Sequence, residues 1–567
     1  MSAAPGLSVA ATGDAARAVA AHVPALVADR VASRVAAQDP DLWGAEAAEE
    51  AGKRLGWVDV AARSADVPAR VEALRAELAA EGVDRVVLCG MGGSSLAPEV
   101  ITATAGVPLV VLDGTDPGQV RRALAEGLER TVVVVSSKSG GTVETDSQRR
   151  AFVAAFEGAG VDAARRVVVV TDPGSPFSQM ARDEGYRALF EADPDVGGRY
   201  SALTAFGLVP AGLAGVDVRG LLDDAAEALA ALAADDEANP GLQLGAALGG
   251  TDPLRDKLVL VEDGTPLRGF GAWAEQLVAE STGKSGTGLL PVVVAGPGSP
   301  EVASSPADAL VVRLVGPGGS DDASPDEDPS PGRTSAAEVR VAGSLGAQMA
   351  LWETAVVVAG RLLGINPFDQ PDVESAKNAT RELLEGSPET EDPTAVDGAV
   401  ELRATPELDG ATTLEDAVGA LLSQLSSVEG DRGYLAVMAY LDREADADLE
   451  AVREDLAART GRPVTFGWGP RFLHSTGQYH KGGPATGVYL QITSAPAGED
   501  LPIPDRPFTF GGLQRAQAAG DAAVLAEHGR PVLRLHLVER SALGRVRAAL
   551  AGRGGAGTTA GGDGGAR

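Results

Sequence analysis

Residues 132–145 read VVVVSSKSGGTVET, and this stretch decides which fold we expect. Its four valines form a short β-branched run typical of a buried strand, and its last residues begin a polar helix. The loop between them (136–142) carries three serines, a lysine, two glycines and a threonine. Where a parallel strand passes into a helix, backbone N–H groups and the helix dipole attract an anion. The stretch therefore predicts a phosphate-binding loop, with an ordinary strand–helix turn as the alternative.

Length and composition limit the classes of protein that this chain can represent. The chain has 567 residues, 44% of them hydrophobic, which is enough for several domains and more than one core. A net charge of −32 argues against a nucleic-acid partner. No run of 18 apolar residues and no signal-peptide pattern is visible, so we expect no membrane span and no secretion. The only cysteine, Cys89, excludes an intrachain disulfide, and we expect a cytoplasmic location.

Strand-like runs alternate with helix-like segments along most of the chain, which predicts an α/β protein with parallel sheets. Residues 1–80 are expected to form a helical N-terminal segment that begins with a loose stretch at 1–13. Two α/β subdomains are expected at 81–220 and 221–390, and an α/β extension at 391–551.

Two segments have the composition of irregular chain. Residues 316–337 are rich in Pro, Gly, Ser and Asp, so we expect a mobile acidic loop within the second subdomain. Residues 552–567 are mostly Gly and Ala, and we expect a disordered tail.

No motif in the chain indicates a metal or a cofactor. The glycines at 90–93 do not complete a dinucleotide fingerprint, because Ser95 stands where the third glycine is needed. Gly283-Lys284-Ser285 is not a P-loop, because Val278 replaces the first glycine of that motif. Histidine, cysteine and carboxylate spacings typical of metal sites are also missing. These patterns favour acid–base chemistry without a metal or a cofactor.

Five segments resemble, in chain order, the signature blocks of the phosphoglucose isomerase family. They are GMGGSS (90–95), SSKSGGTVET (136–145), VGGRYS (196–201), QLVAESTGK (276–284) and GINPFDQPDVESAK (364–377). Two later segments, at 469–484 and 501–517, resemble the actinobacterial-type isomerase that is found elsewhere fused to transaldolase. No transaldolase part is visible in this chain.

The resemblance implies a fold and a reaction. The fold is two sugar-isomerase (SIS) subdomains, each a three-layer α/β/α sandwich around a parallel sheet, usually in a homodimer. The reaction is aldose–ketose isomerisation of glucose 6-phosphate and fructose 6-phosphate through a cis-enediol, as in glycolysis and gluconeogenesis. The family needs neither metal nor cofactor, and its small-molecule partner is the sugar phosphate.

The resemblance also assigns residues. Glu280 resembles the base that moves a proton between C2 and C1, and Arg199 the cation that stabilises the enediolate oxygen. Lys377 resembles the lysine that assists ring opening. Such a base must be ionised near neutral pH, which a neighbouring guanidinium favours. The residues expected to bind the substrate are Gly93 and Ser94 of the first loop, Ser137, Lys138, Ser139 and Thr142 of the phosphate loop, and Gln276 and Gln370.

The ring-opening histidine departs from the family pattern. The family takes it from the neighbouring subunit, between the base and the last lysine, but no histidine lies between Glu280 and Lys377 here. The segment His474-Ser-Thr-Gly-Gln-Tyr-His480-Lys-Gly resembles the missing one at a later place in the chain. We therefore expect His474 to open the ring, with His480 as second choice and a structural loop histidine as the alternative. The sequence leaves open whether His474 acts within its own chain or across a dimer.

Two alternative functions follow from the same residues. An isomerase of this kind could also accept mannose 6-phosphate, depending on how the site treats O2 of the sugar. A non-catalytic SIS module that senses sugar phosphates is the other. Glu280, Arg199 and Lys377 together argue against sensing, because a sensor needs no base.

Overall fold

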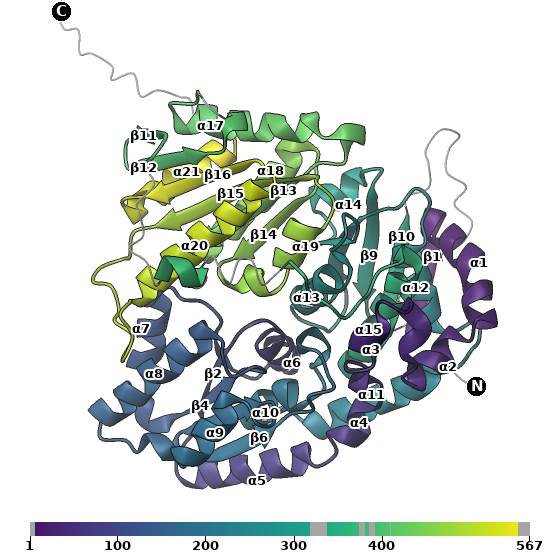
Figure 1. Ribbon diagram of the computed structural model, residues 1–567, viewed down its shortest axis with the longest axis horizontal. Coiled ribbons are helices and arrows are strands. Elements are labelled where there is room, and N and C mark those ends of the chain that lie inside the picture. The colour runs from purple at the N-terminus through teal and green to yellow at the C-terminus, as the bar shows by residue number, and fades with distance from the viewer. Residues whose placement is uncertain (1–5, 318–336, 373–379, 385–391, 409, 554–567) are drawn as a thin grey trace, which may run out of the picture.

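The computed structural model describes residues 6–317, 337–372, 380–384, 392–408 and 410–553. Three β-sheets with helices packed against them make up the described part of the chain (Figure 1). The expected α/β class with parallel sheets is confirmed. Lys377, most of the acidic loop (318–336) and most of the tail (554–567) lie outside the described residues.

The first sheet is parallel throughout, with the strand order β3-β2-β4-β5-β6. The valine run at 132–135 lies in β4 at the middle of this sheet, as predicted. The strand order reverses between β2 and β4, and in open parallel sheets a ligand crevice forms at the carboxyl end of such a reversal. The strands are β2 (Arg85–Gly90), β3 (Val110–Leu112), β4 (Thr131–Ser136), β5 (Val167–Thr171) and β6 (Ala188–Glu191).

Both faces of the first sheet are covered by helices, so its strands read as continuous apolar runs. Val132 and Val134 face one layer of helices, and Val133 and Val135 face the other. This alternation confirms the three-layer α/β/α arrangement here. The first layer holds α5 (Val67–Ala80), α6 (Leu96–Ala105) and α10 (Ala205–Ala214), and the second α7 (Pro117–Ala125), α8 (Val143–Gly158) and α9 (Pro176–Asp183).

The second sheet has the order β1-β10-β9-β7-β8 and is parallel except for its edge strand β1. The prediction of a loose N-terminus is wrong for residues 8–12, because these residues pair with β10 along their whole length. An edge strand needs only one hydrogen-bonded neighbour, so a short segment distant in sequence can complete a sheet. The strands are β1 (Ser8–Thr12), β7 (Lys257–Asp263), β8 (Leu290–Val293), β9 (Ala309–Val315) and β10 (Glu338–Ala342).

One face of the second sheet packs on helices, whereas the other packs on the C-terminal part of the chain. Leu258 and Leu260 of β7 share a core with the helices, and Val259 and Val261 share one with Tyr434 and Tyr489 of the third sheet. The helices on the first face are α1 (Gly13–Ala28), α11 (Val218–Leu232), α12 (Pro240–Gly249), α13 (Phe270–Thr282) and α15 (Leu345–Leu363).

The C-terminal extension is α/β, as expected, and its sheet has the order β11-β12-β16-β15-β13-β14. Strands β13 to β16 are parallel, and β12 and then β11 extend one side of the sheet in antiparallel pairing. The strands are β11 (Ala395–Asp397), β12 (Val400–Ala404), β13 (Tyr434–Tyr440), β14 (Val464–Trp468), β15 (Gly487–Ser494) and β16 (Val532–Leu537). Helices α17 (Leu414–Gln424), α18 (Val452–Thr460) and α21 (Leu543–Leu550) cover one face, and α19 (Gly477–Gly482) and α20 (Phe510–Glu527) lie at the other.

The N-terminal residues do not form a unit of their own. Helix α1 packs on α12 beside the second sheet, and α5 packs on α10 beside the first. The short helices are α2 (Val31–Ala36), α3 (Ala48–Ala51), α4 (Val60–Arg63) and α14 (Pro300–Ser304). None of the helices in the described ranges has both the length and the apolar character needed to cross a membrane.

Short 3₁₀ turns connect many of these elements. Three of them belong to the candidate site: η3 (Gly92–Ser94), η6 (Gly198–Tyr200) and η11 (Arg471–His474). The others are η1 (Pro40–Trp43), η2 (Gly56–Asp59), η4 (Leu128–Arg130), η5 (Ala163–Arg165), η7 (Pro406–Leu408), η8 (Leu425–Ser427), η9 (Glu429–Asp431), η10 (Ala447–Ala451) and η12 (Arg540–Ala542).

Candidate active site

Two glycines let three loops meet at the carboxyl edge of the first sheet. A Cβ atom on Gly93 would lie 2.0 Å from the carbonyl oxygen of Gly198, so η3 and η6 pack backbone against backbone. Gly92 has a φ of +54°, and a Cβ there would lie 3.0 Å from the carbonyl oxygen of His474. Only glycine allows this close approach. Ser94, the last residue of η3, is buried beside them.

Glu280 is a buried carboxylate at the centre of a group of polar side chains. It lies on α13, and only 3% of the residue is exposed. The side-chain amide of Gln370 donates to its Oε2 at 2.8 Å, and that of Gln276, one helical turn earlier, lies 3.4 Å from the same oxygen. Arg199 Nη1 lies 4.0 Å from this oxygen. Three residues expected at the site from sequence thus surround the expected base.

The Arg199 guanidinium is held in place by several acceptors. Its Nε donates to the Ser281 hydroxyl at 2.7 Å, and its Nη2 donates to the Pro367 carbonyl at 2.5 Å. The residue is 3% exposed. A buried guanidinium held in this way can meet negative charge that develops on a substrate oxygen without first having to move.

Lys284 was not expected at the site, although it ends one of the family-like blocks. Its ammonium donates to the carbonyls of Asn366 and Asp369 at 2.9 and 2.7 Å and to the Asp369 carboxylate at 2.8 Å. Burial and the nearby Arg199 lower the pKa of Lys284 to about 8. Lys284 and Arg199 therefore both bind carbonyls of the loop that presents Gln370 to Glu280.

The predicted phosphate loop lies at the reversal point of the first sheet. Ser137 and Thr142 join their hydroxyls across the loop at 2.9 Å, and the Thr171 hydroxyl donates to the Ser137 carbonyl at 2.7 Å. Ser139 accepts the Gly141 N–H at 3.2 Å. The loop runs directly into α8, which has 16 residues. This is the strand–loop–helix junction at which an anion is favoured.

Lys138 has a different position from the other loop residues. Its ammonium pairs with the Asp172 carboxylate at 2.7 Å, and the Pro194 carbonyl lies 3.4 Å from it. The lysine therefore ties the loop to the end of β5, and its charge is already met by a carboxylate in this structure.

His474 reaches the site from the C-terminal part of the same chain. Its Nε2 lies 3.2 Å from Glu144 Oε1, in the first turn of α8, and the Gln517 side chain donates to the same oxygen at 2.6 Å. The His474 carbonyl accepts a hydrogen bond from Gln276 at 2.8 Å. Glu144 was missed by the sequence reasoning, although the phosphate-loop block contains it.

His480, the second choice for ring opening, does not join this group. It is buried in the aromatic core, with ring centroids 6.2, 6.4 and 5.2 Å from those of Tyr434, Phe472 and Tyr489. Burial lowers the pKa of His480 to about 3. Neither ring nitrogen has a hydrogen-bond partner in the described part of the chain. The expectation for His480 is corrected: a neutral ring in an apolar core is poorly suited to exchange protons with a substrate.

The arrangement combines an anion-binding loop, a buried carboxylate beside a guanidinium, and an imidazole beside a second carboxylate. These groups can move protons on a small anionic substrate. Among the described residues, no group of three or more His, Cys, Asp or Glu side chains is placed to hold a metal ion.

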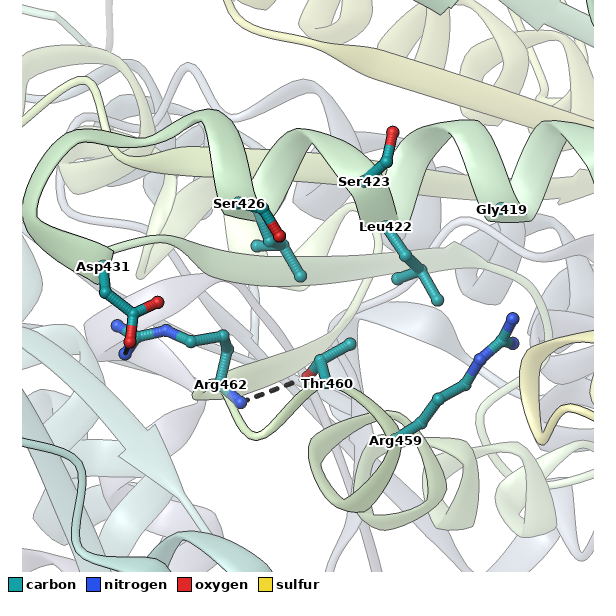
Figure 2. Close-up of a pocket in the computed structure, with 9 residues that line it drawn as sticks. Gly419, Leu422, Ser423, Ser426, Asp431, Arg459, Thr460 and Arg462 are labelled. Carbon is teal, nitrogen blue, oxygen red and sulfur yellow. Dashed lines mark hydrogen bonds and ion pairs between the residues drawn. The ribbon is translucent and has the colours of Figure 1, made fainter.

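A pocket of about 350 Å³ lies elsewhere, on the C-terminal α/β unit (Figure 2). Its lining includes Ser423 on α17, Asp431 before β13, and Arg462 before β14. It therefore opens at the amino ends of these strands, whereas η11 and His474 follow the carboxyl end of β14. Since open parallel sheets bind ligands at their carboxyl edge, this pocket is not the candidate site.

Comparisons with known proteins show which family the chain resembles. Residues 59–235 match the family described as phosphoglucose isomerase. The chain is 34% identical over 357 residues to the probable glucose-6-phosphate isomerase of Haloarcula marismortui, which covers 55% of this chain and 80% of that protein. It is 36% identical over 216 residues to the glucose-6-phosphate isomerase of Rippkaea orientalis, covering 36% of this chain and 41% of that protein. The crystal structure of a hypothetical protein from Thermus thermophilus superimposes with a TM-score of 0.55 and 25% identity, over 67% of this chain and 100% of that one.

Proposed function

This chain belongs to the phosphoglucose isomerase family, and on that premise we propose that it interconverts glucose 6-phosphate and fructose 6-phosphate. The observation that carries the proposal is the placement of Glu280 Oε2 between the Gln370 amide at 2.8 Å and Arg199 Nη1 at 4.0 Å. A carboxylate beside a fixed cation suits proton abstraction next to a carbonyl. The phosphate loop supplies the anchor that such a substrate needs.

The proposed reaction begins with the phosphate group bound by the loop at 137–142. That contact does not change during the reaction, and its binding energy serves to hold C1 and C2 against Glu280. The Glu280 carboxylate takes the proton from C2 of the open-chain aldose, and the electron pair of that C–H bond forms the enediolate. Glu280 then returns the proton to C1 while the hydroxyl proton of O2 passes to O1, which gives the ketose. Arg199 stabilises the negative oxygen between the two steps.

Ring opening comes before this proton transfer. It requires a proton to leave the anomeric hydroxyl and a proton to reach the ring oxygen. We assign this exchange to His474, whose imidazole lies 3.2 Å from the Glu144 carboxylate. Lys377, which lies outside the described residues, remains the proposed second participant. A cytoplasmic location and a homodimer, which the family resemblance implies, complete the proposal.

The test is a coupled assay for conversion of fructose 6-phosphate, with Glu280→Gln as the variant. The amide keeps the size of the side chain and an oxygen that can accept from Gln370, but it cannot take the proton. We expect kcat to fall by about 10³-fold, within the usual contribution of a general base. Glu157→Gln, on an exposed residue of the last turn of α8, is the matched control and should retain wild-type kcat.

Binding separates catalysis from sensing. Glu280→Gln should still bind fructose 6-phosphate in calorimetry, because the phosphate loop is unchanged. If Glu280→Gln converts the sugar at the wild-type rate, Glu280 is not the base. If the wild-type chain binds fructose 6-phosphate but does not convert it, the result supports the alternative of a non-catalytic sugar-phosphate sensor. Mannose 6-phosphate in the same assay measures whether the site also accepts the other configuration at C2.

A further inference from the structure

The C-terminal α/β unit delivers His474 to the site through the turn η11. This turn follows β14, and its backbone covers η3, since a Cβ on Gly92 would lie only 3.0 Å from the His474 carbonyl and 3.1 Å from the His474 Cβ. Arg471 begins η11 and His474 ends it. A 3₁₀ turn has three residues per turn, so side chains three positions apart project from the same side. Arg471 and His474 do so here, and both contact the first sheet's subdomain.

Arg471 enters a partly buried group of four charges at this contact, in which Asp113 is fully buried. Its Nη1 lies 2.5 Å from Glu99 Oε2 and 2.6 Å from Asp113 Oδ2. Arg443, from the loop after β13, donates to Glu99 at 2.9 Å and lies 3.4 Å from Asp113. Burial acts to raise the pKa of Glu99, but Arg471 and Arg443 outweigh it and lower that pKa to about 2. The Glu99 carboxylate is therefore ionised, and both arginines hold it in place.

Glu99 and Asp113 lie on elements of the first sheet's subdomain that border the candidate site. Glu99 lies in the first turn of α6, the helix that follows η3. Asp113 directly follows β3 at the carboxyl edge of the first sheet. Arg471 thus connects η11 to the elements that carry Gly93 and Ser94, and a movement of this ion pair would move His474 with it.

The same C-terminal unit is fixed to the second sheet's subdomain. Its α19 packs on α13, the helix of Glu280, where the two units meet (Figure 1). Gln478 of α19 donates to the Gly283 carbonyl at 2.9 Å and to the Asp372 carboxylate at 2.7 Å. Farther from the site, Arg453 pairs with Glu301 at 2.5 Å. The unit is held on both sides of the site by contacts within one chain.

We propose that the C-terminal α/β unit completes the active site within the same chain, with Arg471 as the positioning residue that sets His474 over the sugar-phosphate site through Glu99 and Asp113. This inference rests on the proposed isomerase function. It predicts that no second copy of the chain supplies a residue for ring opening.

Mixing two inactive variants tests whether the site is made by one chain. His474→Ala and Glu280→Gln are co-expressed with different tags and purified through both tags in sequence, and mixed homogeneous samples serve as a second arm. If the site lies in one chain, neither arm regains activity on fructose 6-phosphate. If a partner chain supplied the histidine, one of the two sites of each mixed dimer would be intact. The doubly purified sample would then regain about half of wild-type activity, and a randomly exchanged mixture about a quarter. Restored activity would overturn the inference.

A double-mutant cycle tests the role of Arg471. Arg471→Met should lower kcat about 100-fold, the usual result of misplacing a reacting group by about 1 Å, and should leave KM nearly unchanged. Arg471→Lys, which keeps the charge, should regain part of the loss. In a His474→Ala background, Arg471→Met should have no further effect on kcat, since it acts through the histidine. Effects that multiply in the double variant would overturn the positioning role.

Arg453→Met is the matched control, because it removes an ion pair of the same unit that lies at the amino end of β14, the end farther from η11. Its kcat should stay within about twofold of wild type, at a temperature where circular dichroism shows all variants folded. The failures are distinguishable. A wild type that converts neither sugar phosphate refutes the proposed function and the inference with it, whereas an active wild type with restored mixtures refutes the inference alone.

Discussion

Replacing Gly93 by alanine tests the closest backbone contact of the candidate site. The added Cβ would lie 2.0 Å from the Gly198 carbonyl oxygen and 2.7 Å from its carbon, whereas ordinary contacts begin at 3.4 Å. Both atoms are backbone, so no side chain can rotate away. The loops η3 and η6 must separate by about 1.4 Å, and Gly198 directly precedes Arg199.

The shift has two expected consequences. Overpacking of this size costs about 2 kcal/mol of stability, which thermal unfolding would show as a lower Tm. Displacement of Arg199 from its position 4.0 Å from Glu280 should lower kcat for fructose 6-phosphate by at least about 100-fold. The loss of activity should therefore be much larger than the loss of folded protein at the assay temperature.

The control is Gly158→Ala. Gly158 ends α8, its φ is not positive, and a Cβ there would meet nothing within 4 Å. This variant should keep wild-type kcat and lose no stability, because alanine has the higher helix propensity. If Gly93→Ala keeps kcat/KM within about twofold of wild type, the contact between η3 and η6 does not position Arg199, and the reasoning fails.

Three further predictions concern the loop, a titrating carboxyl group and a buried lysine. Thr142→Ala, which removes the hydroxyl partner of Ser137, should raise KM for fructose 6-phosphate about tenfold, and an unchanged KM would contradict the phosphate-loop assignment. Burial raises the pKa of the partly exposed Glu275 from 4.5 to about 7. Between these two pH values the folded chain keeps a proton on Glu275 that the unfolded chain has released, so the free energy of unfolding falls as the pH rises from 4.5 to about 7. Glu275→Gln should therefore stabilise the chain by on the order of 2 kcal/mol more at pH 8 than at pH 4.5, and an equal Tm gain at both pH values would contradict it. Lys284→Met removes three hydrogen bonds to the loop that carries Gln370, and it should lower kcat for fructose 6-phosphate at least about tenfold. The affinity for inorganic phosphate, measured by calorimetry, should stay unchanged, and an unchanged kcat would contradict the prediction.

Much of the fold could be predicted because it depends on local patterns. The valine run at 132–135 has β-branched side chains on both faces, and the change to hydroxyls and glycine marks where β4 ends. The edge strand at 8–12 could not be predicted in this way. A five-residue segment has no strong periodicity of its own, and its pairing with β10 closes a loop of more than 300 residues.

The chain's sequence by itself determined which chemical groups the site contains. Carboxylate, guanidinium, amides and hydroxyls stand in blocks whose order matches the family, and the imidazole stands in a block displaced to a later place in the chain. Tertiary structure alone decided which of two similar histidines lies beside the candidate site. His474 and His480 are six positions apart, yet one ring meets Glu144 and the other is buried among tyrosines. Local sequence cannot separate them, because the partners of each ring come from α8 and from β13 and β15, which only folding brings near.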